Sequence, residues 1–362
     1  MIKIGFLLLS VTLATPGFAT QYVSDPLVVI DPGKDSLKML ERSFPELIID
    51  HVSSLGYEVY GPEGFDQLLT KLGLKFVAVD KSNEVSLIDY PSPEASIQRL
   101  IDLQKKYPSL ITLMEIGKSG DGRSLVFAKL TGSNTRLKQN KPEFKYIANM
   151  HGDEIVGREL MIKLIEDLAS NYGRDNRITR LMDAAQIYIM PSMNPDGASR
   201  KIRFNAKGVD LNRSFPDFTT TDNQNTWQNR AVEIQAIMKF QAQHHFKLSA
   251  NFHGGAEVVN YPWDGQAALH PLDNLVKKLS LNYANRVTYL RASTEFKNGI
   301  TNGYQWYEVK GGMQDWSYHW YNDLQVTIEL TKTKWPSYST IDQSYAANRD
   351  ALLNYIEDMF QF

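Results

Sequence analysis

The stretch Phe144-Lys145-Tyr146-Ile147-Ala148-Asn149-Met150-His151-Gly152-Asp153-Glu154 decides the fold, because a largely apolar run ends directly in three ionisable residues. The apolar run predicts a buried strand, and residues 156–168 that follow it predict a helix. The polar motif therefore falls in a loop between a strand and a helix, at the carboxyl end of the strand. Open α/β sheets bind their ligands at this edge.

A second histidine stands in the same kind of position. His253 ends the predicted strand 248–252 and is followed at once by glycine, as His151 is. Both histidines would therefore project from one sheet edge, where His151, Glu154 and His253 could fill three corners of a zinc site and leave the fourth for water. The alternative is that the histidines pack locally and that Glu154 is an ordinary acid of a first helical turn, favoured by the helix dipole.

A third segment, Thr327-Ile328-Glu329-Leu330, supplies a further carboxylate. Val326, Ile328 and Leu330 alternate as an apolar face, so Thr327 and Glu329 point to the other side of the strand. Glu329 then faces either a cleft, where it could act as a base, or solvent, as a glutamate on an edge strand.

The rest of the chain alternates short strands and helices. We expect further strands at 186–190 and 325–330 and helices at 93–107, 226–245, 272–286 and 345–359. Before them, a helix at 36–52, a strand at 56–60, a helix at 64–72 and a strand at 75–79 are typical of a small α+β unit. Turn-rich residues at 80–84 and 90–93 mark a boundary. The predicted organisation is an N-terminal unit at 20–87 and a larger α/β unit at 88–362.

Residues 1–19 have the pattern of a secretory signal peptide, with Lys3, an apolar run at 4–13 and a small-x-small site ending at Ala19. This pattern predicts export, to the periplasm or the medium. No later run approaches the roughly 20 apolar residues of a membrane span, so no stable membrane insertion is expected. The 39 basic and 41 acidic residues, with a net charge of −2, give no electrostatic footprint for nucleic acid. Nothing in the sequence indicates an oligomeric state.

Several motifs in a fixed order carry a family resemblance. Asn194-Pro195-Asp196-Gly197, the stretch 203–217 and Gly311-Gly312-Met313-Gln314-Asp315-Trp316 accompany the three segments already named. Together they cover roughly three quarters of the chain, from Tyr90 onward. The sequence resembles the zinc metallocarboxypeptidases, and within them the regulatory branch of the N, E, D and M types. The resemblance implies a mixed β-sheet flanked by helices and one Zn²⁺ bound by His151, Glu154 and His253.

The resemblance also implies a role for each matching residue in hydrolysis of the C-terminal peptide bond of peptides or proteins. Glu329 would be the general base that takes a proton from the metal-bound water. Arg203 would polarise the scissile carbonyl, a task suited to a permanently charged donor. Asn212 and Arg213 would hold the terminal carboxylate of the substrate, and Tyr307 would close over the bound peptide.

Specificity is expected to depend on Asp264, which stands where the regulatory branch carries the acid that pairs with lysine or arginine. Gln314 would line the same pocket. A carboxylate there favours a C-terminal Lys or Arg through a charge-assisted hydrogen bond. The alternative is that Asp264 is a turn residue after Pro262.

Two departures from the family pattern bear on function. Asp153 stands where many digestive-type relatives carry arginine, and no transthyretin-like domain is expected after the helix 345–359. The N-terminal unit 20–87 is interpreted either as a pro-region that covers the cleft or as a permanent accessory domain. Two other functions stay open, namely cleavage of bacterial cell-wall stem peptides and peptide binding without catalysis.

Overall fold

A computed structural model of the chain describes residues 25–30, 40, 43, 44, 46–52, 55–86, 89–132 and 141–362. Its main feature is an eight-stranded sheet with the strand order β11-β10-β12-β9-β7-β8-β6-β5. The predicted signal peptide lies outside the described residues. The strands are β5 Ile111–Lys118, β6 Ser124–Leu130, β7 Glu143–Ala148, β8 Gln186–Met190, β9 Phe246–His253, β10 Glu257–Tyr261, β11 Ile300–Asn302 and β12 Leu324–Leu330.

The sheet is mixed, and its four central strands are parallel. β8, β7, β9 and β12 pair in parallel, whereas β5 and β6 form an antiparallel hairpin and β10 runs antiparallel to β12. Parallel central strands bring their carboxyl ends to one edge. The predicted mixed α/β sheet is confirmed.

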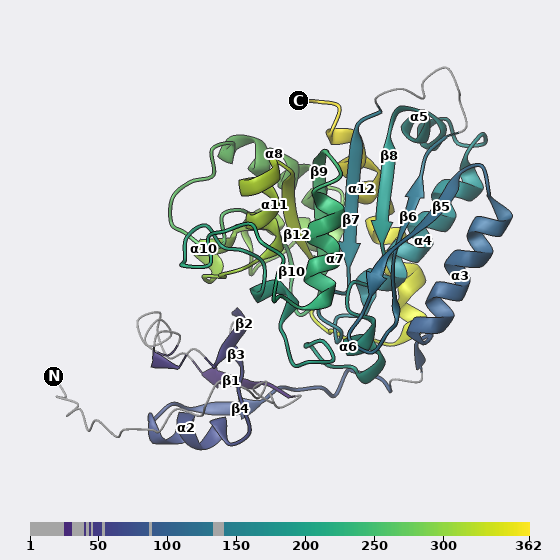
Figure 1. Cartoon of the computed structure of the whole chain (residues 1–362). Helices are drawn as coiled ribbons and strands as arrows, with labels where there is room; N and C mark the ends of the chain where they lie inside the picture. Colours follow the sequence, from purple (N-terminus) through teal and green to yellow (C-terminus); the bar gives the residue numbers. More distant parts are fainter. Residues whose placement is uncertain are drawn as a thin grey trace.

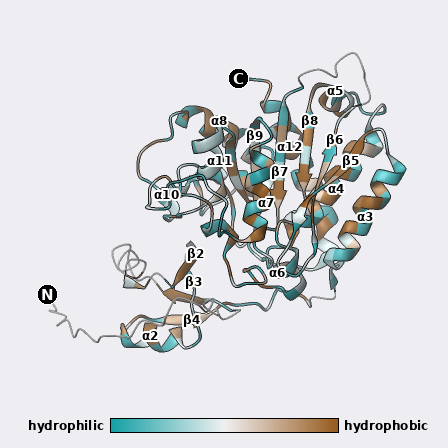
Figure 2. Ribbon diagram, in the orientation of Figure 1, coloured by the Kyte–Doolittle hydropathy of each residue, from teal (hydrophilic) through white to brown (hydrophobic). Residues whose placement is uncertain are grey.

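Helices cover both faces of this sheet (Figure 1). On one face, α4 Val156–Asn171, α8 Asp273–Ala284 and α12 Ile341–Asp358 share an apolar core with the strands, joined by α3 Pro93–Lys106. On the other face, α7 Val232–Gln241 and α11 Met313–Tyr321 pack over a second core. Figure 2 shows the hydrophobic residues concentrated on the central strands and the inward sides of these helices. This larger unit also contains shorter helices, namely α5 Asn176–Ala184, α6 Pro195–Arg200, η3 Leu211–Arg213, α9 Thr288–Arg291, η4 Lys297–Gly299, α10 Gly303–Trp306 and η5 Tyr338–Thr340.

The N-terminal residues form a second, smaller sheet with its own core. β1 Leu27–Ile30, β2 Ile48–Val52, β3 Gly56–Tyr60 and β4 Phe76–Ala78 pair in the order β2-β3-β1-β4, with α2 Phe65–Lys71 beside them. Val29, Val59 and Leu69 are fully buried in this core. The unit lies against the edge of the larger sheet where the parallel strands end (Figure 1).

Two predicted helices differ from the structure. Residues 48–52 of the predicted helix 36–52 form strand β2, because β-branched Ile48 and Ile49 pair with β3. The predicted helix 226–245 begins only at Val232, since Asn229 has a φ of 63° that is incompatible with a right-handed helix. Much of 36–47 lies outside the described residues.

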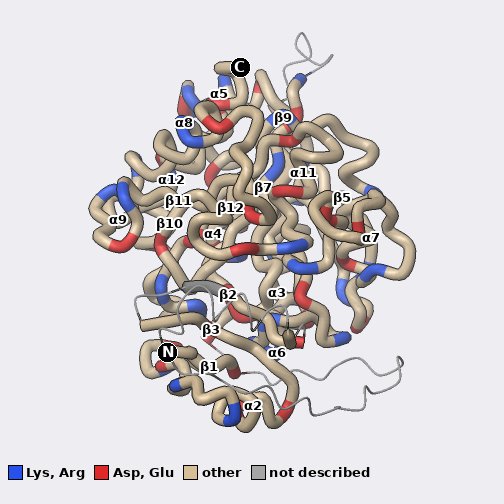
Figure 3. The backbone as a smooth tube through the Cα atoms, turned by 90° about the vertical axis from the view of Figure 1, so that its left-hand side faces the viewer, with Lys and Arg blue, Asp and Glu red and all other residues tan. Residues whose placement is uncertain are grey.

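Among the described residues, no helix has the length and apolar character needed to cross a bilayer. Basic and acidic residues alternate over the molecule without either sign gathering on one side (Figure 3). This mixture agrees with the small net charge of −2.

Candidate active site

Two neighbouring parallel strands bring the predicted zinc ligands together. His151 and Glu154 lie in the loop that follows β7, and His253 is the last residue of β9. One ligand atom from each of the three residues lies within 4.8 Å of the others, and all three side chains are buried. The group is one that could hold a metal ion.

The donor atoms face a common point. His151 Nδ1 lies 2.9 Å from Glu154 Oε1, His253 Nδ1 lies 2.8 Å from Glu154 Oε2, and the two Nδ1 atoms are 3.0 Å apart. Two imidazole nitrogens and a carboxylate are donors that zinc prefers. The residues therefore fit the ion in number, type and orientation.

Asp210 fixes the orientation of His151 from outside this group. Its Oδ1 lies 3.2 Å from His151 Nε2. Burial raises the pKa of Asp210, but the charges of Arg203, His151 and Arg213 and the hydrogen bond from His151 together outweigh burial and hold that pKa well below its usual value. The ionised carboxylate accepts the Nε2 proton, so Nδ1 is the nitrogen left for a metal.

The loop that carries His151 and Glu154 is braced by its neighbours. Asn149 Nδ2 donates to the carbonyl oxygens of His151, Gly152 and Glu154 at 2.8, 3.2 and 3.2 Å. Gly152 passes so close to Gly197 that a Cβ atom on Gly152 would lie 2.1 Å from the Gly197 carbonyl carbon. Sequence reasoning did not single out Asn149, although its place directly before the motif was an available signal.

Glu329 lies on an interior strand, beside the metal group. β12 pairs with β9 on one side and β10 on the other, and Glu329 is in register with His253. Residues in register on neighbouring strands project to the same face of a sheet. Because Glu329 is only 7% exposed, its interpretation as a solvated glutamate on an edge strand is wrong.

Arg203 is fully buried next to the metal group. Its Nε donates to Asp210 Oδ2 at 2.8 Å, and its Nη1 lies 3.1 Å from His151 Nδ1 and also pairs with the carboxylate of Asp50. Its Nη2 is buried and makes no hydrogen bond within the described part of the chain. A fixed, unsatisfied cationic donor suits an oxygen that develops negative charge.

Asn212 and Arg213 lie in η3, which begins with Asp210 accepting a hydrogen bond from the Asn212 backbone N–H at 2.9 Å. Asn212 Oδ1 accepts from Met313 N at 2.9 Å, which leaves the amide NH₂ as the donor group. Arg213 Nη2 donates to the Ile49 carbonyl oxygen at 2.6 Å. A strand of the N-terminal unit thus holds the guanidinium that was predicted to bind a substrate carboxylate.

Tyr307 stands between the two units. It packs against the apolar core of the N-terminal unit, and the Arg213 guanidinium lies 6.0 Å from the centre of its ring. Burial raises the pKa of the Tyr307 phenol. The tyrosine predicted to close over substrate is therefore covered by N-terminal residues.

Asp264 and Gln314 are both buried and lie side by side. Asp264 Oδ1 accepts from Gln314 Nε2 at 2.6 Å and from Asn260 Nδ2 at 3.1 Å. Burial raises the pKa of Asp264 to about 7, although both hydrogen bonds and the charge of Arg213 oppose the rise. Asp264 lies in the bend that follows Pro262, and only 3% of its surface is exposed.

Lys334 connects the two units and was missed by sequence reasoning. Its Nζ donates to Asp50 Oδ2 at 2.5 Å, Glu58 Oε2 at 2.9 Å and the Tyr60 hydroxyl at 3.2 Å. Burial lowers the pKa of Lys334, but the carboxylates of Asp50 and Glu58 outweigh this and raise it well above its usual value. Tyr60 in turn donates to Asp153 Oδ2 at 3.4 Å. Asp153 therefore contacts the N-terminal unit.

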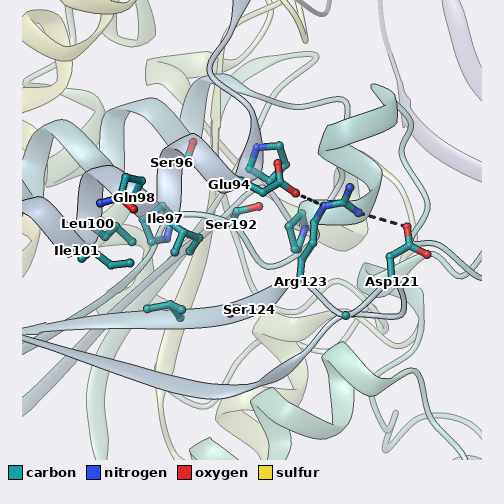
Figure 4. Close-up of a pocket in the computed structure, with 15 residues that line it drawn as sticks. Glu94, Ser96, Ile97, Gln98, Leu100, Ile101, Asp121, Arg123, Ser124 and Ser192 are labelled. Carbon is teal, nitrogen blue, oxygen red and sulfur yellow. Dashed lines mark hydrogen bonds and ion pairs between the residues drawn. The ribbon is translucent and has the colours of Figure 1, made fainter.

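A separate pocket of about 410 Å³ opens between α3 and the β5–β6 turn. Figure 4 shows Ile97, Leu100 and Ile101 at one end and Arg123 between Glu94 and Asp121 at the other. Arg123 pairs with Glu94 at 2.8 Å and with Asp121 at 3.3 Å. None of the residues predicted for the active site lines this pocket.

Known proteins are similar to this chain in sequence and in fold. The chain is 39% identical over 284 residues to carboxypeptidase M of Mus musculus. This match covers 72% of the chain and 63% of that protein. It is 40% identical over 280 residues to carboxypeptidase D of Anas platyrhynchos. This match covers 70% of the chain and 20% of that protein. The chain thus spans less than two thirds of the length of these relatives.

Solved structures extend the likeness over nearly the whole chain. Carboxypeptidase A from Helicoverpa armigera superposes with a TM-score of 0.73 at 19% identity and covers 94% of this chain and 98% of its own. Thrombin activatable fibrinolysis inhibitor superposes with a TM-score of 0.68 at 17% identity and covers 94% and 99%. At these identities the likeness shows a shared fold. The family model for zinc carboxypeptidases matches residues 97–351, and the chain belongs to that family.

Proposed function

We propose that this protein is a zinc-dependent carboxypeptidase that removes C-terminal Lys or Arg from peptides or proteins and acts after export. The observation that supports it most directly is the arrangement at the sheet edge. Three zinc donors, the Glu329 strand position and an unsatisfied Arg203 Nη2 converge there. This set would provide three metal ligands, a general base and a donor for the oxyanion.

In this proposal, His151, Glu154 and His253 hold the ion, which supplies Lewis acidity that lowers the pKa of a bound water. Glu329 takes a proton from the attacking water and later delivers it to the leaving amine. Arg203 Nη2 donates to the carbonyl oxygen as that oxygen gains charge. The water oxygen forms a bond to the carbonyl carbon, and the C–N bond breaks to release the C-terminal residue.

Three further residues would select the substrate. Arg213 and the Asn212 amide would bind the terminal carboxylate, which restricts the cut to the chain end. Asp264 would pair with the cation of the last side chain, and an apolar side chain would leave that buried carboxylate without a cationic partner. A diamino-acid side chain of a cell-wall stem peptide carries a cation too, so such a peptide belongs in the substrate panel.

We further propose that the N-terminal unit is a pro-region rather than a permanent accessory domain. Ile49 presents its carbonyl oxygen to Arg213, and Asp50 presents its carboxylate to Arg203. These are the two cations assigned to the substrate. While β2 lies there, the N-terminal unit engages Nη1 of Arg203 and Nη2 of Arg213, so it would compete with a peptide for them.

Metal removal tests the proposed chemistry. A chelator is expected to abolish release of C-terminal Arg from a short peptide, and added Zn²⁺ is expected to restore it, because the water has no other activating cation in the proposed mechanism. The assay measures released amino acid with the N-terminal unit detached. Full activity in protein shown by elemental analysis to lack metal would contradict the proposal.

Replacing Asp264 with Asn tests specificity. In the wild type, the preference for C-terminal Arg over Leu is expected to be greatest above pH 7 and to fall below it, because Asp264 has a pKa of about 7 and attracts a cation only when ionised. Asp264→Asn is expected to lose about 2 kcal/mol of this preference, or roughly thirtyfold, and to show no pH dependence of it.

The measurement is kcat/KM for peptides that differ only in the last residue, from pH 6 to 9. Asp222→Asn, at an exposed position, is the matched control. A wild-type preference for Phe or Glu would overturn the assignment of Asp264.

A further inference from the structure

Thr327 lies behind the proposed specificity pocket. It precedes Glu329 by two residues on β12 and is in register with Asn251 of β9. Only 5% of its surface is exposed, so the hydroxyl needs a partner within the protein. Thr327 Oγ1 donates to Gln314 Oε1 at 3.0 Å.

This hydrogen bond determines which way the Gln314 amide faces. A carboxamide has one oxygen that only accepts and one nitrogen that only donates. With Oε1 held by Thr327, Nε2 points to Asp264 Oδ1 at 2.6 Å. If the amide turned over, its oxygen would face the carboxylate, and two acceptors would meet unless Asp264 took up a proton.

We propose that Thr327 is a positioning residue for basic specificity, which keeps Gln314 oriented so that Asp264 stays ionised and available to a C-terminal Lys or Arg. This inference rests on the proposed role of Asp264 in binding the substrate side chain. In this proposal, Thr327 acts through Gln314.

Several groups around Asp264 act on its pKa. Burial is the largest influence and raises this pKa, the hydrogen bonds from Asn260 and Gln314 and the charge of Arg213 of η3 lower it, and the charge of Asp217 of the following loop raises it. Asp315 of α11 accepts from the backbone N–H groups of Asp264 and Gly265, and its own pKa is raised by burial and by Asp264. Lys310 donates to the Gly265 carbonyl at 2.5 Å. Burial and nearby charges thus act on Asp264 in opposite directions, and the hydrogen bond from Gln314 is one of the interactions that favour its ionised form.

Thr327→Val removes the hydroxyl and keeps the branched shape that a strand favours. At pH 7 this variant is expected to lose about fivefold in kcat/KM for a peptide ending in Arg, mostly through KM, and little for the same peptide ending in Leu. The reason is that the pKa of Asp264 is about 7, and raising it by about one lowers the ionised fraction of Asp264 at pH 7 about fivefold. The midpoint of the Arg preference is expected to move to higher pH, so that the preference recovers near pH 9.

Controls separate this role from a structural one. Thr327→Ser keeps the hydroxyl and is expected to retain the wild-type profile. Thr301→Val is the matched control, because Thr301 lies on β11 of the same sheet and its hydroxyl donates to the Asn302 carbonyl at 3.3 Å, away from Gln314. In a Gln314→Leu background, Thr327→Val is expected to add no further shift, since residues acting through one contact are not additive.

The experiment uses the full chain, assayed before and after a cut within the exposed residues 80–83. A Thr327→Val profile equal to the wild type, or an equal loss with the Arg and Leu peptides, would overturn the inference and leave the proposed function intact. A wild type without any preference for basic residues would overturn the proposed specificity and the role of Thr327 with it.

Discussion

Replacement of Glu329 by Gln is expected to reduce kcat by about 10²- to 10⁴-fold, the usual contribution of a general base. Gln has nearly the same shape as Glu but cannot take a proton from the attacking water. Glu329 lies on an interior strand in register with the zinc donor His253, so the change alters a proton acceptor beside the metal group and not a surface charge. Zinc content is expected to stay at the wild-type value, because Glu329 is not one of the three donors.

The measurement combines kcat, from release of C-terminal Arg with the N-terminal unit detached, with elemental analysis of zinc. Glu257→Gln is the matched control, because Glu257 lies on the neighbouring strand β10, one position from the register partner of Glu329. This control is expected to keep wild-type kcat. Undiminished turnover in Glu329→Gln would exclude Glu329 as the base, and loss of zinc along with activity would assign it to the metal instead.

The metal group could be predicted from sequence because each histidine lies in a short, recognisable pattern at the end of a strand. A strand followed by His and Gly places His151 and His253 at one edge once the strands are parallel neighbours. The alternation of Val326 and Ile328 likewise gave the direction of Glu329. It could not show that β12 is an interior strand, because the order of strands in a sheet depends on pairings between distant segments.

Contacts between the units left no comparable signal. Asp50 and Arg203 are 153 positions apart, and Asp50 and Lys334 are 284 apart. No periodicity joins such residues, and a buried ion pair looks in sequence like two surface charges. The expected helix over 36–52 was also wrong for residues 48–52, which form strand β2. This strand brings Asp50 to Arg203 and Ile49 to Arg213.

Opening the chain between the two units is expected to raise activity by two orders of magnitude or more. Residues 80–83 are exposed, whereas Glu84 pairs with Lys201 at 2.8 Å and the Val85 N–H donates to the Trp335 carbonyl at 3.1 Å. A protease site engineered at Lys81 would therefore cut after the N-terminal sheet and leave the following segment anchored. A covalent tether holds the N-terminal unit at an effective concentration of about 1 mM. Once the tether is cut, the unit can dissociate from the catalytic unit on dilution.

Replacing Asp50 tests which contact maintains the proposed block. Asp50→Ala leaves Arg203 and Lys334 buried without one of their partners, and breaking a buried pair in this way costs about 3–5 kcal/mol. The uncut Asp50→Ala chain is expected to be partly active, and the cut variant to reach full activity at higher protein concentration than the cut wild type. Glu63→Ala changes an exposed acid of the same unit and is expected to behave as wild type.

The readout is kcat/KM for a C-terminal Arg peptide, before and after cleavage, over a dilution series. Full activity in the uncut wild type, unchanged by cleavage, would show that the unit is an accessory domain whose β2 leaves the cleft when substrate binds. Activity that rises on cleavage but not in Asp50→Ala would instead place the block on the Ile49 carbonyl and the covered Tyr307. The carboxylate of Asp50 contacts Arg203, and the carbonyl of Ile49 contacts Arg213. Comparison of Asp50→Ala with the cut wild type therefore assigns the inhibition either to Asp50 or to the other contacts of the unit.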